Sequence, residues 1–194
     1  GLIVSSAIAQ PPAAPPVAAP EPGAALATDP LNTAATYAFI MDGDSGIPLY
    51  SKRGDEPMIP ASMSKLMLYY MTFERLKAGR LTMTDQFSVS EHAWRTGGAG
   101  TDGSTMFLPL NSKVSVEDLL KGAIIVSGND ACIVLAEGLF GSEEAYARAA
   151  TARAKELGMT GSTFANATGL DAPTHRMSAH DIALIAHRII KDFP

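Results

Sequence analysis

The chain has 194 residues, of which 46% are hydrophobic, and its formal net charge at pH 7 is −5. This length and composition predict one globular domain with a sizeable core, or most of a larger domain. Lysine and arginine form no run and the overall charge is acidic, so we expect no binding to nucleic acid.

Cysteine and histidine usage narrows the chemistry further. Cys132 is the single cysteine, which excludes an internal disulfide. It lies in an apolar run, so we predict a small buried side chain rather than a catalytic thiol. The four histidines form neither an H-E-x-x-H motif nor a Cys/His cluster, so we predict no metal site and no cofactor.

Two unusual segments open the chain. Residues 1–9 are apolar and end in Ala7-Ile8-Ala9, which fits the cleavage site of a secretion signal, and the first residue is not methionine. We therefore predict the remnant of a signal peptide and an exported protein, with an ordinary apolar strand as the alternative. Residues 10–36 are dominated by proline and alanine, which predicts an extended linker. A proline-rich docking ligand is the alternative, but no basic residue flanks these prolines.

Ordered structure is predicted from Tyr37 onward. Residues 37–42 and 47–52 flank the turn-rich Gly43-Asp44-Ser45-Gly46, which is typical of a β-hairpin. Pro48 suits an edge or a bulged position in the second strand. An isolated hairpin is marginally stable, so we expect further strands in a longer chain.

The rest of the chain is predicted to be largely helical. One helix should begin at Ser62 and end around Gly79, with its methionines in the core. Ser115 and Ser178 fit helix caps. Four further helices are predicted over residues 116–126, 130–140, 143–157 and 179–191.

Ser62 and Lys65 lie three residues apart in Pro60-Ala61-Ser62-Met63-Ser64-Lys65, where the first helix is predicted to begin. Residues i and i+3 share one face of a helix, so the Lys65 amine can reach the Ser62 hydroxyl and act as its base. The free N–H groups of a helix start also suit a developing oxyanion. Serine is equally a common helix cap and lysine a common surface residue, so the motif alone does not separate the two interpretations.

A second polar motif, Ser127-Gly128-Asn129, interrupts two strongly apolar predicted helices. A polar interruption between buried helices needs an explanation. One explanation is a plain turn, in which Ser127 ends one helix and Asn129 caps the next.

Taken together and in this order, the two motifs resemble those of the serine D-alanyl-D-alanine carboxypeptidases, which are the low-molecular-mass penicillin-binding proteins. The resemblance covers residues 37–194 and includes Asn166-Ala167-Thr168-Gly169-Leu170 and Ser178-Ala179-His180-Asp181. It implies an α+β, β-lactamase/transpeptidase-like fold with an N-terminal hairpin and a helical subdomain. Residues 37–194 would then be an incomplete catalytic domain that lacks the other strands of its antiparallel sheet.

The resemblance also implies a role for each motif residue. Ser62 corresponds to the nucleophile, Lys65 to its base and Ser127 to a proton relay toward the leaving amine, while Asn129 would bind the substrate backbone. The implied reaction removes the terminal D-alanine from a peptidoglycan stem peptide through an acyl-enzyme, and β-lactam antibiotics would acylate the same serine as covalent inhibitors. The implied location is the periplasm or the outer face of the bacterial cytoplasmic membrane.

The sequence departs from the family pattern in one respect. The third motif of the family, Lys-Thr-Gly, is absent, and Arg95-Thr96-Gly97 lies between the first two motifs, where we interpret it as part of a glycine-rich loop that borders the cleft. We therefore expect the chain to stop before the third motif and to lack full activity on its own. Relatives often carry a C-terminal amphipathic helix, so any membrane attachment would come through a segment after Pro194.

Other functions remain open at this point. A class A β-lactamase is disfavoured because Gly128 stands where that class usually has aspartate, and because no glutamate lies in an E-x-x-L-N context. A catalytically silent relative that binds peptidoglycan would keep the fold without the chemistry. A D,D-endopeptidase would use the same residues on cross-linked peptides.

Overall fold

The computed structural model describes residues 30–194, so the predicted signal remnant, 1–9, and most of the predicted linker, 10–36, lie outside the described residues. The chain separates into two units, and the second, Ala34–Pro194, carries all the elements named below. In chain order they are β1 (Ala38–Met41), β2 (Pro48–Lys52), the 3₁₀ helix η1 (Ala61–Ser64), α1 (Lys65–Lys77), β3 (Gln86–Ser88), α2 (Glu91–Gly97), β4 (Lys113–Ser115), α3 (Val116–Ile125), α4 (Asn129–Phe140), α5 (Glu143–Glu156) and α6 (Ala179–Asp192).

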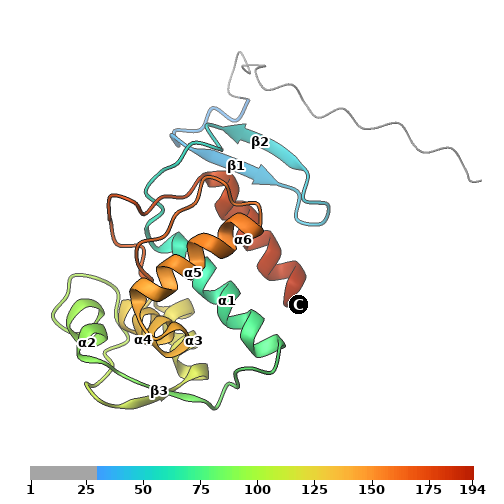
Figure 1. The fold of residues 1–194 in the computed structure, drawn as a ribbon. Helices are drawn as coiled ribbons and strands as arrows, with labels where there is room; N and C mark the ends of the chain where they lie inside the picture. Colours follow the sequence, from blue (N-terminus) through green and yellow to red (C-terminus); the bar gives the residue numbers. More distant parts are fainter. Residues whose placement is uncertain (1–29) are drawn as a thin grey trace, which may run out of the picture. The chain divides into compact units, whose positions relative to one another are not determined.

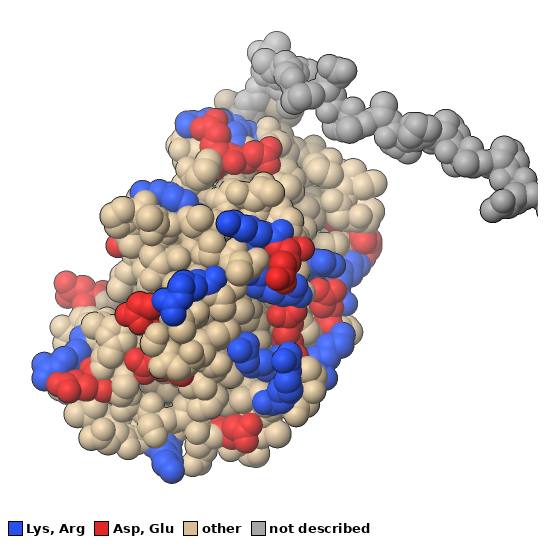
Figure 2. Space-filling model, in the orientation of Figure 1, with Lys and Arg blue, Asp and Glu red and all other residues tan. Residues whose placement is uncertain are grey.

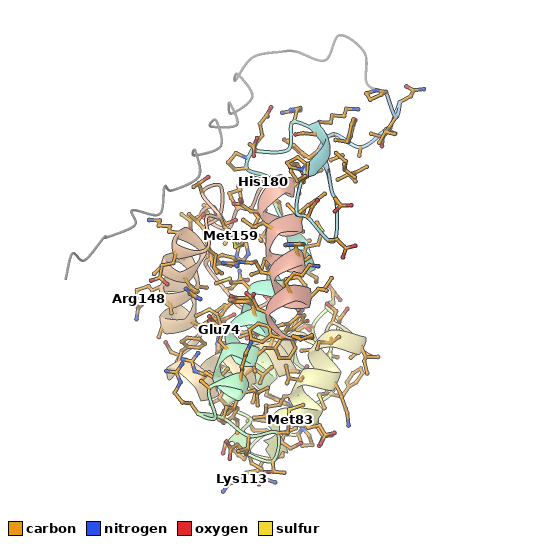
Figure 3. All side chains as sticks on the ribbon, turned by 90° about the vertical axis from the view of Figure 1, so that its right-hand side faces the viewer. Glu74, Met83, Lys113, Arg148, Met159 and His180 are labelled. Carbon is orange, nitrogen blue, oxygen red and sulfur yellow. The ribbon has the colours of Figure 1, made fainter. Side chains whose placement is uncertain are left out.

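The predicted hairpin is present as the antiparallel pair β1–β2. Its register shifts at a bulge between Ile40 and Met41, directly beside the Met41–Pro48 pair, so the bulged position predicted for Pro48 is confirmed. The hairpin lies against the start of α6, where the rings of Phe39 and His180 are 4.7 Å apart. Figure 3 shows His180 at this end of α6, next to the hairpin. Packing on a helix stabilises a pair of strands that would be marginal alone.

The core forms around α1 and α4. Every residue from Asn129 to Ala136 is buried, and from Ala131 onward this part of α4 is apolar on all its faces. Figure 1 shows the hairpin at one end of this unit and β3 at the other, with α6 running beside α1. Cys132 is fully buried, as predicted. Met67 and Met71 also lie in the core, but Met63 is 47% exposed, so its predicted core position was wrong.

Most helix boundaries agree with the prediction to within one residue. The predicted caps Ser115 and Ser178 accept hydrogen bonds from Asp118 N at 3.1 Å and Asp181 N at 3.0 Å. The first helix differs, because Ser62 lies in η1 and the α-helix itself begins at Lys65. A 3₁₀ turn at a helix start still places residues i and i+3 above one another, so the expected Ser62–Lys65 pairing survives the change.

The structure also contains elements that the prediction missed. Helix α2 replaces the first part of the expected glycine-rich loop, and β3 pairs with β4 in a second small antiparallel sheet. The expectation of one hairpin followed by five helices was therefore incomplete. A seven-residue helix and three-residue strands are too short for hydrophobic periodicity to show.

Charges of both signs are intermingled on the face shown in Figure 2. Pairs such as Lys121–Glu117 and Arg95–Glu91 join neighbouring turns of a helix. Within residues 30–194, no helix is both long and apolar enough to span a bilayer. The same residues contain no cluster of three or more His, Cys, Asp or Glu side chains that could hold a metal ion.

Candidate active site

The Ser62 turn lies at the molecular surface. Ser62 is exposed in η1, and Lys65 directly after η1 points inward with only 1% of its surface exposed. Ala61 has φ +50°, a left-handed conformation that non-glycine residues rarely adopt. Strained backbone of this kind persists only where the surrounding structure fixes it, and it occurs often at functional sites.

The Lys65 amine joins the two sequence motifs. Its Nζ lies 3.0 Å from Ser62 Oγ, 2.9 Å from Ser127 Oγ and 2.8 Å from Asn129 Oδ1, and it also donates to the Ser127 carbonyl at 3.0 Å. The structure therefore brings together all the predicted site residues: Ser62, Lys65, Ser127 and Asn129. These contacts give Lys65 more oxygen partners than the three N–H groups of an ammonium can serve, whereas a neutral amine can also accept a proton from a serine hydroxyl.

Burial lowers the pKa of the Lys65 amine, because an ammonium loses hydration there. None of the ion pairs within residues 30–194 supplies Lys65 with a carboxylate. The nearby Cys132 thiol does not replace one, since burial raises its pKa to about 12 and it stays neutral at pH 7. Burial thus shifts Lys65 toward its neutral form, which is the form that can act as a base.

The Ser127 turn is tightly held between α3 and α4. Ser127 has φ +56°, and its neighbours are fixed by hydrogen bonds from Gly128 N to Gly122 O at 3.1 Å and from Asn129 N to Ser104 O at 2.8 Å. Gly128 is the residue that precedes α4, and no side chain caps this helix. The alternative in which Asn129 caps the helix is therefore wrong, because its side chain turns to Lys65 instead.

Asp130 holds the chain segment next to the Ser127 turn through hydrogen bonds. It is fully buried, and its carboxylate accepts hydrogen bonds from Met106 N, Leu108 N and the Thr105 hydroxyl, at 2.9 to 3.0 Å. These bonds fix the chain segment that runs beside Asn129. A buried carboxylate is tolerated when donors surround it. Sequence reasoning missed this role, although an aspartate at the start of an otherwise apolar helix was a usable signal.

A cavity of about 250 Å³ lies beside Asn129. Gly103 borders it, and a Cβ added there would approach Asn129 Nδ2 to 2.5 Å, so the loop and the Asn129 side chain are in close contact. The second half of the expected glycine-rich loop thus borders this cavity, while its place at the substrate cleft stays a prediction. The lining residues are Thr96, Thr101, Asp102, Gly103, Asn129 and Leu170.

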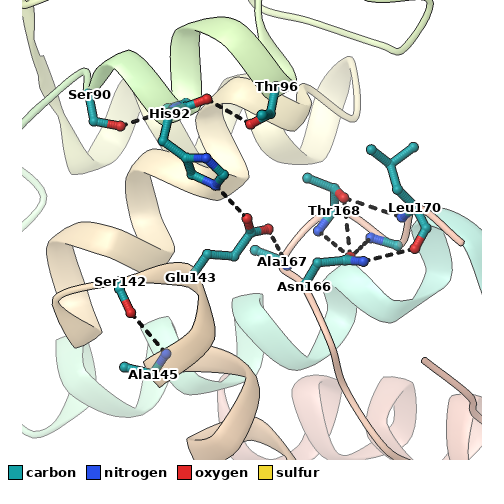
Figure 4. A network of polar contacts seen from close by, with 12 residues as sticks. Ser90, His92, Thr96, Ser142, Glu143, Ala145, Asn166, Ala167, Thr168 and Leu170 are labelled. Atoms are coloured by element: carbon teal, nitrogen blue, oxygen red, sulfur yellow. Dashed lines mark hydrogen bonds and ion pairs between the residues drawn. The ribbon is translucent and has the colours of Figure 1, made fainter. Parts of the chain in front are cut away.

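The Asn166–Leu170 turn supports the Ser62 turn from the other side. Asn166 Oδ1 accepts from Gly169 N at 2.8 Å, and its amide donates to Leu170 O at 2.8 Å, so one side chain shapes the whole turn (Figure 4). Gly169 then meets the backbone of Ala61 so closely that an added Cβ would lie 2.0 Å from the Ala61 carbonyl oxygen. From the sequence alone this stretch shows only a resemblance to the family, because the residues that it contacts are distant in the sequence.

Comparisons with known proteins agree with this geometry. D-alanyl-D-alanine carboxypeptidase DacC of Escherichia coli is 43% identical over 157 residues, which cover 80% of this chain and 39% of the relative. The structure of penicillin binding protein 5 from Haemophilus influenzae has a TM-score of 0.78 at 38% identity, over 82% of this chain and 46% of that one. Penicillin-Binding Protein D2 from Listeria monocytogenes, solved in its ampicillin-bound form, has a TM-score of 0.69 at 26% identity, over 82% of this chain and 63% of that one.

The fold is thus the α+β, β-lactamase/transpeptidase-like fold of the penicillin-binding proteins, as expected from the sequence. The sequence profile of the D-alanyl-D-alanine carboxypeptidases matches residues 24–194, and the chain belongs to this family. It spans about two fifths of the length of the curated relatives it matches.

Proposed function

We propose that the protein to which this chain belongs is a serine D-alanyl-D-alanine carboxypeptidase, which removes the terminal D-alanine from peptidoglycan stem peptides. The main support is the position of the buried Lys65 amine, within hydrogen-bond distance of both Ser62 Oγ and Ser127 Oγ. A single base that contacts a nucleophile and a second hydroxyl can collect a proton at one place and return it at another.

In the first step, neutral Lys65 takes the Ser62 proton while Ser62 Oγ attacks the carbonyl carbon of the penultimate D-alanine. The peptide bond then breaks, and the proton passes from Lys65 through Ser127 to the amine of the departing D-alanine. Asn129 would hold the substrate backbone, since its amide lies at the edge of the cavity that the loop borders. Water then attacks the ester on Ser62, which releases the shortened peptide and restores the serine.

β-Lactams are proposed to acylate Ser62 by the same route, with the ring amide in place of the peptide bond. Support comes from the ampicillin-bound form of the Listeria relative. The proposed location is the periplasm or the outer face of the cytoplasmic membrane, where the substrate occurs. It rests on the signal-like residues 1–9. We expect the third family motif, Lys-Thr-Gly, in the region of the full-length protein that corresponds to the part of the relatives not matched by this chain.

A fluorescent penicillin tests the proposal on the full-length protein. We expect a covalent label on the wild type and no label on Ser62→Ala, because only Ser62 carries the acyl group. A wild type without Ser62-dependent label would favour the catalytically silent alternative. Release of free D-alanine from uncross-linked stem peptides is the expected product. Cleavage of cross-linked peptides alone would assign the protein to the endopeptidases.

A further inference from the structure

One carboxylate outside the catalytic set contacts both sides of the candidate site. Glu143 lies in the first turn of α5, and its side chain is only 12% exposed. One of its oxygens accepts from Ala167 N at 2.8 Å, and the other contacts His92 Nε2 at 2.8 Å. Figure 4 shows this carboxylate between α2 and the Asn166–Leu170 turn.

The first contact leads to the nucleophile. Ala167 is the second residue of the turn that Asn166 shapes, and it is 1% exposed. Two residues later, Gly169 packs on the Ala61 carbonyl, directly before Ser62. A shift of the turn would therefore move the backbone on which the strained Ala61 rests.

The second contact leads to the Ser127 motif. His92 belongs to α2, and the same helix ends at Gly97. A Cβ added to Gly97 would lie 2.5 Å from Asp130 N and 2.7 Å from the Asn129 carbonyl carbon, so α2 lies directly against the start of α4. Glu143 thus links two elements that each touch one half of the site.

A simple capping role does not account for this placement. Ser142 already caps α5 by accepting from Ala145 N at 3.1 Å. Glu144, in the same helical turn, is exposed and supplies the negative charge that a helix N-terminus favours. The Glu143 side chain instead points into the protein, and each of its two oxygens contacts a segment that is distant in the sequence.

We propose that Glu143 is a positioning residue for acyl transfer, which holds the Asn166–Leu170 turn and helix α2 in register so that Ser62 and Asn129 keep their places around Lys65. This inference rests on the proposed function. Small displacements of reacting groups can slow a reaction by about 100-fold, so the loss of such a link should appear in a rate.

The test is the kinetics of Ser62 labelling by a fluorescent penicillin in the full-length protein. The rate constant reports the geometry of the folded site, and the final labelled fraction reports how much protein is folded. We expect Glu143→Ala to lower the rate constant by about 10- to 100-fold with little loss of labelled fraction. Glu143→Gln should stay within about threefold of the wild type, because its amide oxygen can still accept from Ala167 N.

Two further variants separate the contacts. Glu144→Ala is the matched control, since it removes the neighbouring charge without touching either segment, and its rate constant should stay within about twofold. His92→Ala cuts only the link to α2, and because the His92 side chain is 45% exposed the variant should fold; we expect a threefold to tenfold fall.

Several results would overturn the inference. Glu143→Ala could label at the wild-type rate, or lose only labelled fraction, which would leave a purely structural role. Glu143→Gln could be as slow as Glu143→Ala, or Glu144→Ala could be as slow as Glu143→Ala, and either result would assign the effect to charge. An unchanged His92→Ala rate would remove the link to α2. A wild type that takes up no label overturns the proposed function, and this inference with it.

Discussion

The Ser62 turn and the Ser127 turn meet at the Lys65 amine, yet they are held in different ways. Both contain a strained residue, with φ +50° at Ala61 and +56° at Ser127. The Ser62 turn is exposed and is supported by the backbone of Gly169, which packs against it without a side chain. The Ser127 turn lies between α3 and the buried start of α4, and it depends on hydrogen bonds, above all those of the Asp130 region.

This difference shows that one strained geometry can be fixed either by steric contact or by buried polar groups. A turn held by steric contact should be destabilised when a methyl group is added at the contact. A turn held by hydrogen bonds should be destabilised when an acceptor is lost. Lys65, which contacts both turns, should no longer act as a base when it is replaced by a residue that cannot release its proton. The three substitutions below separate these cases.

The largest effect is expected where the two turns join. Lys65→Arg keeps a cation but holds its proton at every accessible pH, so it cannot accept the Ser62 proton. We expect penicillin acylation to fall by about 10²- to 10⁴-fold. An acylation rate near that of the wild type would mean that another group is the base.

The pH dependence of acylation gives a second comparison of the wild type with Lys65→Arg. Because burial lowers the pKa of Lys65, more of this amine is neutral at a given pH than in an exposed lysine. Acylation by the wild type should rise about tenfold per pH unit up to the Lys65 pKa and then level off, while Lys65→Arg should show no such rise. Lys155→Arg, on α5, serves as the unaffected control.

The next effect concerns the steric support of the Ser62 turn. Gly169→Ala adds a methyl group 2.0 Å from the Ala61 oxygen at a φ of +84°, so the free energy of unfolding should fall by about 3 kcal/mol. Gly158→Ala is a matched control, because Gly158 has φ +86° with nothing within 4 Å of the added Cβ, and it should cost only about 1 to 2 kcal/mol. Equal losses in urea unfolding would mean that backbone strain alone, and not contact, explains Gly169.

The smallest effect concerns the polar support of the Ser127 turn. Asp130→Asn places an amide NH₂ where the wild type has an acceptor, so one or more donors among Met106 N, Leu108 N and Thr105 lose a partner. We expect the free energy of unfolding to fall by about 1 to 3 kcal/mol. Asp118→Asn, in the first turn of α3 and exposed, should cost less than about 1 kcal/mol. A loss no greater than this control would show that the buried carboxylate is dispensable.

The sequence pointed to the four residues that the structure brings together because the patterns that mark them are local. The Ser62–Lys65 spacing follows helical geometry, and the Ser127 motif stands out against apolar helices on both sides. The supports of both turns were not predictable in this way. Gly169 and Glu143 act on residues that are close in space and distant in sequence, so no spacing reveals them.

The same distinction explains the fold. Long apolar or capped segments such as α4 and α6 were predicted to within a residue, since burial over several turns leaves a clear pattern. Helix α2 and the β3–β4 pair are short and depend on their neighbours, for example on the packing of Gly97 against Asp130. Local propensity is too weak to specify such elements.

Ala61 shows where stability and activity conflict in this molecule. Its side chain is exposed, so glycine would fit and would relieve about 1 to 2 kcal/mol of left-handed strain, at about 0.5 to 1 kcal/mol for the added freedom of the unfolded chain. Ala61→Gly, at the residue before the proposed nucleophile, should therefore stabilise the protein. That substitution would give the turn access to conformations in which the Ser62 hydroxyl no longer meets the lysine. Stability screens of this protein should accordingly select changes at position 61 that a screen for acylation rejects.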